Sequence, residues 1–511
     1  MAGKSLSVGP AWVLVCLAAA AGCGGAGGAR DIVQRDELSS SAAGPKITRV
    51  TDLGDMRTPL PRRGVMPRPD SDDRFALGEL ILIEGNDFGR LPAVRIGGQA
   101  VRILARTGTG GIVCRIPAGI DSGTIEIVIS HEGGRDATSI GVERYAVLVD
   151  RTTGQVHFVA LGRGSEGDVR ATLAIPGALD ARISPDGRAA YVVANPGPAD
   201  ETATLHVISL TAAGGPKPVR TLHLDLAHVV AFGVATRAPL GAVAGRGRLV
   251  LLDLKSALRP RALAPFPLVA EPGSLAVEPD GARIGLLSPR DNILTPIDVR
   301  QRDLPHVEQS VDLLPGEREP MAVDLEFSPG GGELWVLLGD GPRARSDDEI
   351  HPTRLVSVSW ETGTPRIEST AEVKKATGVP VALAVGRRAR SASRPAPILI
   401  ATVSRKLYAT GPGIAPSRLG DLGQIVAADM SGHSRVLSSH TAVYGDPEVS
   451  HDLAWVVSPT VRLLRGAGGT RFELGLSFDP LPDTRGKYRF VKLGEGRPAG
   501  LKRPPVFAIA P

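Results

Sequence analysis

The stretch Ala181–Val193 reads Ala-Arg-Ile-Ser-Pro-Asp-Gly-Arg-Ala-Ala-Tyr-Val-Val, and two further copies of the pattern follow it along the chain. Residues 275–287 read Leu-Ala-Val-Glu-Pro-Asp-Gly-Ala-Arg-Ile-Gly-Leu-Leu, and residues 325–337 read Leu-Glu-Phe-Ser-Pro-Gly-Gly-Gly-Glu-Leu-Trp-Val-Leu. In each copy an apolar strand enters a Pro-Asp-Gly or Pro-Gly-Gly turn and a second strand leaves it. The turn prolines are 94 residues apart in the first two copies and 50 apart in the last two. A period of about 40 to 50 residues, with four strands in each unit, predicts a β-propeller.

Further strand patterns fill the rest of residues 145–511, the predicted propeller domain. They are 229–233, 240–244 and 248–254, and then the fainter runs 381–385, 398–401, 425–428 and 453–457. The runs 145–150 and 155–160 make half of a blade, which a C-terminal strand at 488–491 or at 506–509 could complete. Such closure removes exposed sheet edges. We count about seven blades, with six or eight also compatible.

The Ser-Pro-Asp-Gly-x-x-x-Tyr-Val turn resembles the YVTN/WD40-like propellers of secreted bacterial proteins. The resemblance implies an architecture and leaves the function open. Asp186 and Asp280 in these turns could be metal ligands, but we favour the simpler interpretation, in which each caps a tight turn before its glycine.

Residues 45–144 show short alternating strands separated by turn signals, which predicts a β-sandwich. Strands are expected at 45–50, at 80–89 with a turn at the end, at 93–98 with a turn made of two glycines, at 111–117 and at 123–129. The Pro- and charge-rich stretch Met56–Arg74 is expected to be a surface loop. Phe88 is expected to fill the core rather than to form a ligand platform. Cys114 lies in an apolar strand and is expected to be a buried, inert thiol.

The succession I-x-G-x-x-F-G, V-x-I-G-G, I-P-x-G and S-G-x-I-x-I in this region resembles the IPT/TIG immunoglobulin-like domain. The residues that carry the resemblance are Ile83, Gly85, Phe88, Gly89, Val94, Ile96, Gly97, Gly98, Ile116, Pro117, Gly119, Ser122 and Gly123. The resemblance implies a spacer or a binding module and brings no catalytic residues. The complete chain is therefore predicted to be all-β, with an immunoglobulin-like β-sandwich followed by a β-propeller.

The N-terminus predicts export. Lys4 precedes the apolar run Ala11–Ala21, which is too short to span a bilayer, since about 20 apolar residues are needed. Residues 1–22 are predicted to be a signal peptide, and residues 23–44 a flexible, glycine-rich tether. The sequence Ala20-Ala21-Gly22-Cys23 resembles a bacterial lipobox, in which the cysteine becomes lipidated, although Ala20 stands where lipoproteins usually have leucine.

The lipobox resemblance implies a lipoprotein of the cell envelope, held in the membrane through a lipid on Cys23. Gly24, in place of an aspartate, favours the outer membrane of a Gram-negative bacterium, with the protein on its periplasmic or surface face. The alternative is an ordinary signal peptide that frees the chain. Cys16 is a poor alternative lipid site because the bulky Val15 precedes it.

Charge excludes one class of partner. The net charge of +5 becomes +4 without Lys4, and the basic residues are scattered over the chain, so nucleic acid is not an expected ligand.

No catalytic, cofactor-binding or metal-binding motif is recognisable. His223 and His228 are close in sequence, but we expect surface or core roles for them. Asp253, Asp298 and Glu361 follow blade-type strands, where solvated turn acids are also found.

These observations favour a non-catalytic binding or scaffolding lipoprotein, with a protein or glycan ligand on the propeller. The alternative is an exported enzyme, such as a lactonase or a glycan-cleaving hydrolase, with its site in the propeller channel. A third hypothesis is an envelope-assembly scaffold. Since function depends on sites rather than folds, the sequence alone does not decide among them.

Overall fold

The computed structural model describes residues 44–54, 75–120, 123–151, 153–161, 168–195, 197, 202–212, 214–269, 271–315, 321–339, 352–360, 363–385, 398–403, 423–438, 442–443, 448–449, 455–466, 469–480, 489–496 and 506–509. Every regular element in these ranges is a β-strand, which confirms the predicted all-β class. None of these segments forms a helix with the length and hydropathy needed to cross a membrane. The predicted signal peptide, Cys23, nearly all of the tether and the loop Met56–Arg74 lie outside them.

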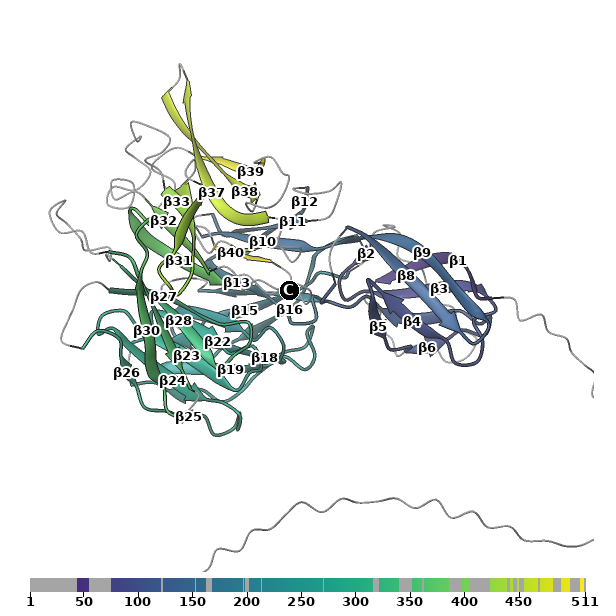
Figure 1. Ribbon diagram of the computed structural model, residues 1–511, viewed down its shortest axis with the longest axis horizontal. Helices are drawn as coiled ribbons and strands as arrows, with labels where there is room; N and C mark the ends of the chain where they lie inside the picture. Colours follow the sequence, from purple (N-terminus) through teal and green to yellow (C-terminus); the bar gives the residue numbers. More distant parts are fainter. Residues whose placement is uncertain are drawn as a thin grey trace, which may run out of the picture. The chain divides into compact units, whose positions relative to one another are not determined.

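Residues 46–143 form two packed sheets with strand orders β1-β3-β7-β6 and β2-β9-β8-β4-β5 (Figure 1). Their strands are β1 (Lys46–Gly54), β2 (Phe75–Ala76), β3 (Leu80–Asn86), β4 (Ala93–Ile96), β5 (Gln99–Val101), β6 (Ala105–Arg106), β7 (Ile112–Arg115), β8 (Gly123–His131) and β9 (Gly134–Glu143). Alternate residues of β3, β7 and β8 point inward, and Ile81, Ile83, Ile112 and Ile127 are fully buried in one core cluster. Burial of each such side chain stabilises the fold by about 1.5–3 kcal/mol.

Two predictions about single residues of the sandwich are confirmed. Phe88 is 4% exposed and fills the core beside Gly85, where a Cβ would lie only 2.6 Å from the Phe88 ring. Cys114 is fully buried, and burial raises the pKa of its thiol to about 12, so the thiol stays protonated and unreactive.

Seven sheets follow in the part of the chain that the structure describes, and we number them blades 1 to 7. Their strands, blade by blade, are β40 (Val506–Ile509), β10 (Tyr145–Asp150), β11 (Gln155–Ala160) and β12 (Val169–Ala174); β13 (Ala178–Ile183), β14 (Ala189–Ala194), β15 (Thr204–Ser209) and β16 (Lys217–His223); β17 (Val229–Val234), β18 (Leu240–Gly245), β19 (Arg248–Asp253), β20 (Arg261–Ala262) and β21 (Phe266–Pro267); β22 (Ser274–Val277), β23 (Arg283–Ser288), β24 (Ile293–Asp298), β25 (His306–Val307) and β26 (Val311–Asp312); β27 (Met321–Phe327), β28 (Glu333–Gly339), β29 (Arg354–Ser359) and β30 (Arg366–Glu372); β31 (Val379–Val385), β32 (Ile398–Val403), β33 (Gly423–Ala428) and β34 (Ser434–Ser438); and β35 (Ala442–Val443), β36 (Glu448–Val449), β37 (Trp455–Gly466), β38 (Gly469–Pro480) and β39 (Arg489–Gly496).

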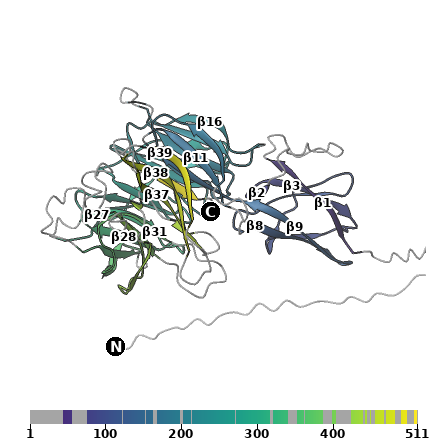
Figure 2. The same cartoon turned by 90° about the horizontal axis from the view of Figure 1, so that it is seen from above.

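The ring closes between the two ends of this region. β40 pairs with β10, with Val149 opposite Val506 and Ala146 opposite Ile509, so the C-terminal strand completes blade 1. Both views place the strands of blade 7, β37 to β39, beside those of blade 1 (Figures 1 and 2). The expectation of about seven blades and of closure by residues 506–509 is confirmed. The other closing candidate, 488–491, was wrong, because Arg489–Val491 belong to β39 and pair with β38.

The repeated turn has the geometry that its sequence predicts. In the copies at residues 184, 278 and 328, the glycine three positions later donates its N–H to the carbonyl oxygen of the first residue, at 2.8–2.9 Å. Gly187, Gly281 and Gly331 have φ values of 72°, 69° and 75°, a conformation that costs glycine little and other residues more. Each turn joins the innermost strand of a blade to the second strand.

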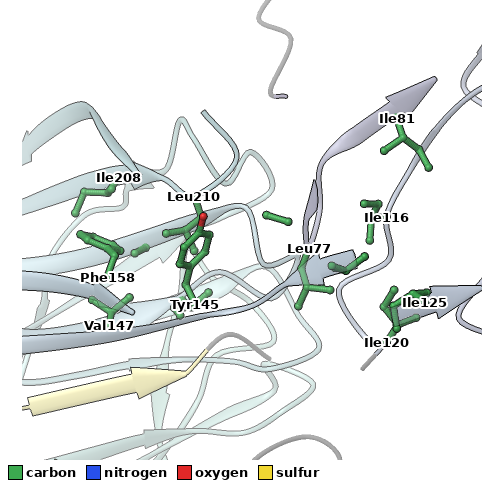
Figure 3. Close-up of a cluster of buried hydrophobic side chains, with 14 of the residues drawn as sticks. Leu77, Ile81, Ile116, Ile120, Ile125, Tyr145, Val147, Phe158, Ile208 and Leu210 are labelled. Carbon is green, nitrogen blue, oxygen red and sulfur yellow. The ribbon is translucent and has the colours of Figure 1, made fainter. Parts of the chain in front are cut away.

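The sandwich continues directly into the propeller. Only Arg144 separates β9 from β10. Leu77 of the sandwich, 2% exposed, belongs to the same buried cluster as Tyr145 and Leu210 of the propeller. Figure 3 shows Leu77 with Tyr145 and Leu210 on one side and the sandwich isoleucines Ile81 and Ile116 on the other. The two folds thus share one apolar core.

Polar and backbone contacts reinforce this junction. Arg170 of β12 forms a two-point ion pair with Glu143 at the end of β9, and the two side chains are only 14% and 13% exposed. A Cβ at Gly187 would lie 3.3 Å from the Leu77 Cβ, and one at Gly78 would lie 2.7 Å from the Asp186 carbonyl oxygen. The turn of blade 2 therefore packs directly on the turn that follows β2.

Candidate functional site

A ligand or catalytic site of the propeller is expected near its innermost strands, since ligand sites of closed β-structures lie at their mouths. β40, β13, β17, β22, β27 and β31 lie at the inner edges of blades 1 to 6, because each contacts the innermost strand of a neighbouring blade. Among the described side chains of these strands, the charged ones are Asp180 and Arg182 on β13 and Asp324 and Glu326 on β27. None of the four was singled out from the sequence.

Four of these strands carry a β-bulge at the same place. Leu179, Val230, Val323 and Val381 each lack a partner in the ladder, on β13, β17, β27 and β31 respectively. A bulge leaves an unpaired residue and bends the strand. Val230 is 44% exposed, although it lies on an innermost strand. Val230 is therefore an exposed apolar side chain on the innermost strand of blade 3.

The residue after the bulge is an aspartate in blades 2 and 5, and both aspartates are engaged in internal bonds. The Oδ1 of Asp324 accepts hydrogen bonds from the N–H of Leu325 at 2.9 Å and from the Ser274 hydroxyl at 2.8 Å, and its Oδ2 accepts one from the N–H of Leu383 at 2.9 Å. Ser274 belongs to blade 4 and Leu383 to blade 6, so one carboxylate joins three blades.

The Asp180 carboxylate also accepts hydrogen bonds from the fold, in this case from groups within blade 2. Its Oδ1 accepts hydrogen bonds from the N–H of Ala181 at 2.7 Å and from the Arg182 guanidinium at 2.9 Å. Two of the three carboxylates described on the innermost strands, those of Asp180 and Asp324, therefore accept hydrogen bonds from donors of the fold.

A signal for these positions was present in the sequence. Asp180, Ser274 and Asp324 each stand five residues before the proline of a repeated turn. Alignment of the three copies on that proline, extended toward the N-terminus, would have identified them as one repeated polar position.

Two asparagines connect neighbouring blades in a related way. The Asn195 side-chain oxygen accepts the N–H of Val229 at 3.2 Å, and that of Asn292 accepts the N–H of Ala322 at 2.7 Å. In each case the connection after the second strand of one blade holds the start of the innermost strand of the next. Asn292 has a φ of 53°, a conformation that asparagine tolerates better than most residues.

Asp186 caps its turn, as expected, whereas Asp280 pairs with an arginine of another blade. Asp186 Oδ1 accepts the Ser184 hydroxyl at 2.6 Å and the N–H of Arg188 at 3.2 Å. Asp280 forms a two-point ion pair with Arg237, at 2.8 and 3.0 Å, and the same arginine donates to the carbonyl oxygens of residues 329 and 330. Arg237 of blade 3 thus links the turns of blades 4 and 5.

The remaining candidates from the sequence are also turn or surface groups. Asp253 accepts the N–H of Lys255 and pairs with Arg302 at 3.3 Å, and Asp298 accepts the N–H of Arg300 at 2.9 Å. His223 and His228 are exposed, and Glu361 lies outside the described residues. Within the ranges that the structure describes, no three His, Cys, Asp or Glu side chains lie close enough together to hold a metal ion.

A charged cluster that the sequence did not reveal lies between blades 4 and 5. Arg283 contacts Glu308 at 3.4 Å and Glu278 at 3.8 Å, and its guanidinium lies 5.6 Å from the centre of the Trp360 ring. The indole N–H of Trp360 donates to Glu308 at 2.8 Å, and Glu278 accepts the N–H of Gly332 at 3.1 Å. The Arg283 guanidinium therefore lies between two carboxylates and beside an indole ring. Such an arrangement stabilises the contact between blades 4 and 5 and is not that of a proton-transfer pair.

A buried histidine and a half-buried one occupy equivalent places in blades 1 and 2. His157 of β11 is 5% exposed and lies 3.0 Å from the Thr172 hydroxyl, and His206 of β15 lies 3.2 Å from the Thr221 hydroxyl. Burial lowers the pKa of His157, against a smaller opposing effect of the Asp150 charge, and burial also lowers the pKa of His206. Both imidazoles are therefore held in the neutral form.

Comparison with known proteins identifies one of the two folds. Residues 74–143 match the family model described as the IPT/TIG domain, which confirms the resemblance of the sandwich motifs. A search of the curated proteins found no match.

Three solved structures illustrate the similarity of the larger fold. A candidate 6-phosphogluconolactonase from Bacteroides uniformis is 13% identical with a TM-score of 0.47, over 69% of this chain and 99% of that chain. A protein from Lactobacillus plantarum is 10% identical with a TM-score of 0.46, over 72% and 99%. A functionally unknown protein from Desulfotomaculum acetoxidans is 11% identical with a TM-score of 0.44, over 69% and 98%. The propeller assignment rests on the sheet order of this chain.

The substitution Asp324→Ala tests the structural role of the inner carboxylates. It leaves donors of three blades without their acceptor, so we expect the free energy of unfolding to fall by about 2–4 kcal/mol, measured by urea denaturation. The matched control is Asp280→Ala, which removes an exposed ion pair and should cost less than about 1 kcal/mol. Equal stability of the Asp324→Ala variant and the unsubstituted protein would contradict the assignment.

The neutral histidines predict a loss of stability in mild acid. Because their folded pKa values lie below the unfolded value of 6.5, the unfolded chain binds protons first as the pH falls through about 6.5, and the free energy of unfolding decreases. The double variant His157→Gln, His206→Gln should lose less stability between about pH 7.5 and pH 5.5 than the unsubstituted protein. The control is the exposed His223→Gln. An unchanged pH dependence in the double variant would refute this explanation.

Proposed function

We propose that this chain is a lipid-anchored protein of the cell envelope whose β-propeller binds a protein or glycan partner without catalysing a reaction. The anchor is a lipid on Cys23 after removal of residues 1–22, and residues 23–44 act as the tether. The membrane that fits this N-terminus is the outer membrane of a Gram-negative bacterium, and the protein would face the periplasm or the cell surface.

The observation that carries the non-catalytic role is the bonding of the inner carboxylates. General acid–base chemistry needs a carboxyl group within hydrogen-bond reach of a substrate proton. Both oxygens of Asp324 accept hydrogen bonds from the fold, and Asp180 Oδ1 accepts two. The bulge residues beside them are aliphatic, which suits contact with a partner better than hydrolysis.

The junction supports presentation of the propeller as a role for the sandwich. A linker of one residue, a shared core and the Arg170–Glu143 ion pair leave little freedom between the two folds. A partner bound to the propeller would therefore keep its orientation relative to the sandwich. Movement relative to the membrane would come from the proposed tether, residues 23–44.

Metabolic labelling with a radioactive fatty acid tests the anchor. We expect label on the unsubstituted protein and its loss in Cys23→Ser, because only a cysteine at the cleavage site can accept the lipid. Cys16→Ser is the matched control and should keep the label. Release of Cys23→Ser from the membrane fraction should accompany the loss. Label that persists without Cys23 would overturn the proposed anchor.

The exposed valine of β17 offers a test of binding. Envelope partners would be captured by crosslinking to the purified protein, and Val230→Asp should reduce capture at least tenfold because it places a charge in an apolar contact. The control is Val269→Asp at a fully exposed position beyond β21. Equal capture by both variants would reject binding at the channel. Turnover of lactone or glycan substrates that is lost in Glu326→Gln would favour the enzyme alternative instead.

A further inference from the structure

The start of the described chain and the loop at residues 87–92 lie at the same end of the sandwich. Lys46 at the start of β1 pairs with Asn86 at the end of β3, so the loop at residues 87–92 leaves the sheet where the chain enters it. Gly44 lies against the turn between β8 and β9, since a Cβ there would be 3.4 Å from the Gly133 carbonyl oxygen. The contacts with the propeller involve other residues, among them Leu77 and Gly78.

The loop is held in a defined shape. Asp87 and Gly89 have φ values of 57° and 66°, and Gly89 packs against the His131 ring, where a Cβ would lie 3.0 Å from Cγ. The Arg106 guanidinium donates to the carbonyl oxygens of Gly89 at 2.8 Å and of Arg90 at 3.3 Å. These bonds fix the backbone immediately before Leu91.

Leu91 is presented to solvent by this braced backbone. Its side chain is 90% exposed, whereas the neighbouring Phe88 is 4% exposed. A leucine could fold back onto the sandwich if the loop were free to move, and the Arg106 bonds oppose that collapse. Single exposed apolar residues are common on protein surfaces, so exposure alone would not identify a contact. The position of this one at the tether end is the second observation.

The groups around Leu91 suit a phospholipid headgroup. Lys46, Arg90 and Arg106 are exposed cations at this end, and they outnumber the exposed carboxylates Asp87 and Glu132. Arginine beside an inserted leucine can reach phosphate with its head while its stem stays apolar.

We propose that the loop at residues 87–92 is a second membrane contact, in which Leu91 inserts into the interface of an anionic bilayer and the neighbouring cations meet lipid phosphate. The inference rests on the proposed anchor at Cys23. Cys23 precedes Gly44 by 21 positions in the sequence, and Gly44 lies at the same end of the sandwich as the loop. The contact would restrict the orientation of the sandwich on the membrane.

The test uses the acylated protein in vesicles of phosphatidylethanolamine and phosphatidylglycerol. Leu91→Cys would be labelled with the polarity-sensitive fluorophore NBD and compared with Leu304→Cys, whose side chain is 73% exposed on the propeller. We expect a blue shift and quenching by brominated lipids at position 91 and neither at position 304. The same chain without its acyl group should bind vesicles about tenfold more weakly after Leu91→Asp, since one leucine is withdrawn from the membrane.

The outcomes separate this inference from the proposed anchor. An NBD emission spectrum typical of water at position 91, in acylated protein bound to vesicles, would overturn the loop contact. It would leave the proposed anchor intact. Loss of the acyl label itself, tested through Cys23→Ser, would overturn the anchor. A shift at position 91 that occurs only when an envelope protein is added would also refute lipid insertion, because the loop would then contact that protein.

Discussion

Packing between consecutive blades is the constraint on which the rest of the propeller depends, because a four-stranded sheet cannot bury both faces alone. The sixth residue after the turn proline shows how the contact is made. Tyr191 reaches blade 3, where its hydroxyl donates to the Ala257 carbonyl at 2.9 Å. In blade 4 the same position is Gly285, and side chains of Leu325 and Leu334 from blade 5 take its space, both 3.0 Å from where a Cβ would lie. Trp335 in blade 5 packs into the cluster of blade 6. At these three boundaries, the residue at this position either reaches into the next blade or leaves space that side chains of the next blade fill.

The same constraint explains why carboxylate side chains occur near the axis of the propeller. Four of the innermost strands carry a bulge, and a bulge leaves a residue of the strand unpaired in the ladder. Buried donors need partners, and a short carboxylate is a compact source of two acceptors. Asp324 supplies one oxygen to its own strand and one to Leu383 in the next blade. Asn195 and Asn292 serve the adjacent boundaries with neutral oxygens. A polar residue near the axis is therefore a candidate for catalysis only when its hydrogen bonds to the fold leave groups that could contact a substrate.

Sequence predicted the features that are local and missed those that are formed across long separations. The Pro-Asp-Gly turns and the alternating strands of the sandwich follow from patterns of a few residues, and the structure confirms them. Closure of the ring joins Ala146 to Ile509, and the sequence left it open between residues 488–491 and 506–509. The Arg237–Asp280 pair joins residues 43 apart, and the Ser274–Asp324 bond joins residues 50 apart. No local pattern specifies such partners, because they depend on how the twist of each sheet places one blade against the next. The junction between the folds escaped prediction for the same reason, since Leu77 and Leu210 meet only after both folds have formed.

The junction changes what an IPT/TIG domain contributes to this chain. A module on a flexible linker would add reach, whereas this one adds its core to that of the propeller, with Arg144 as the only connecting residue. Glu143 and Arg170 are almost wholly enclosed, and enclosed charge pairs are costly to separate because neither group can regain its full hydration. Movement between the two folds would have to break that pair and expose Leu77 and Tyr145 together. Movement at the junction is therefore disfavoured, and the sandwich and the propeller are expected to move as one unit.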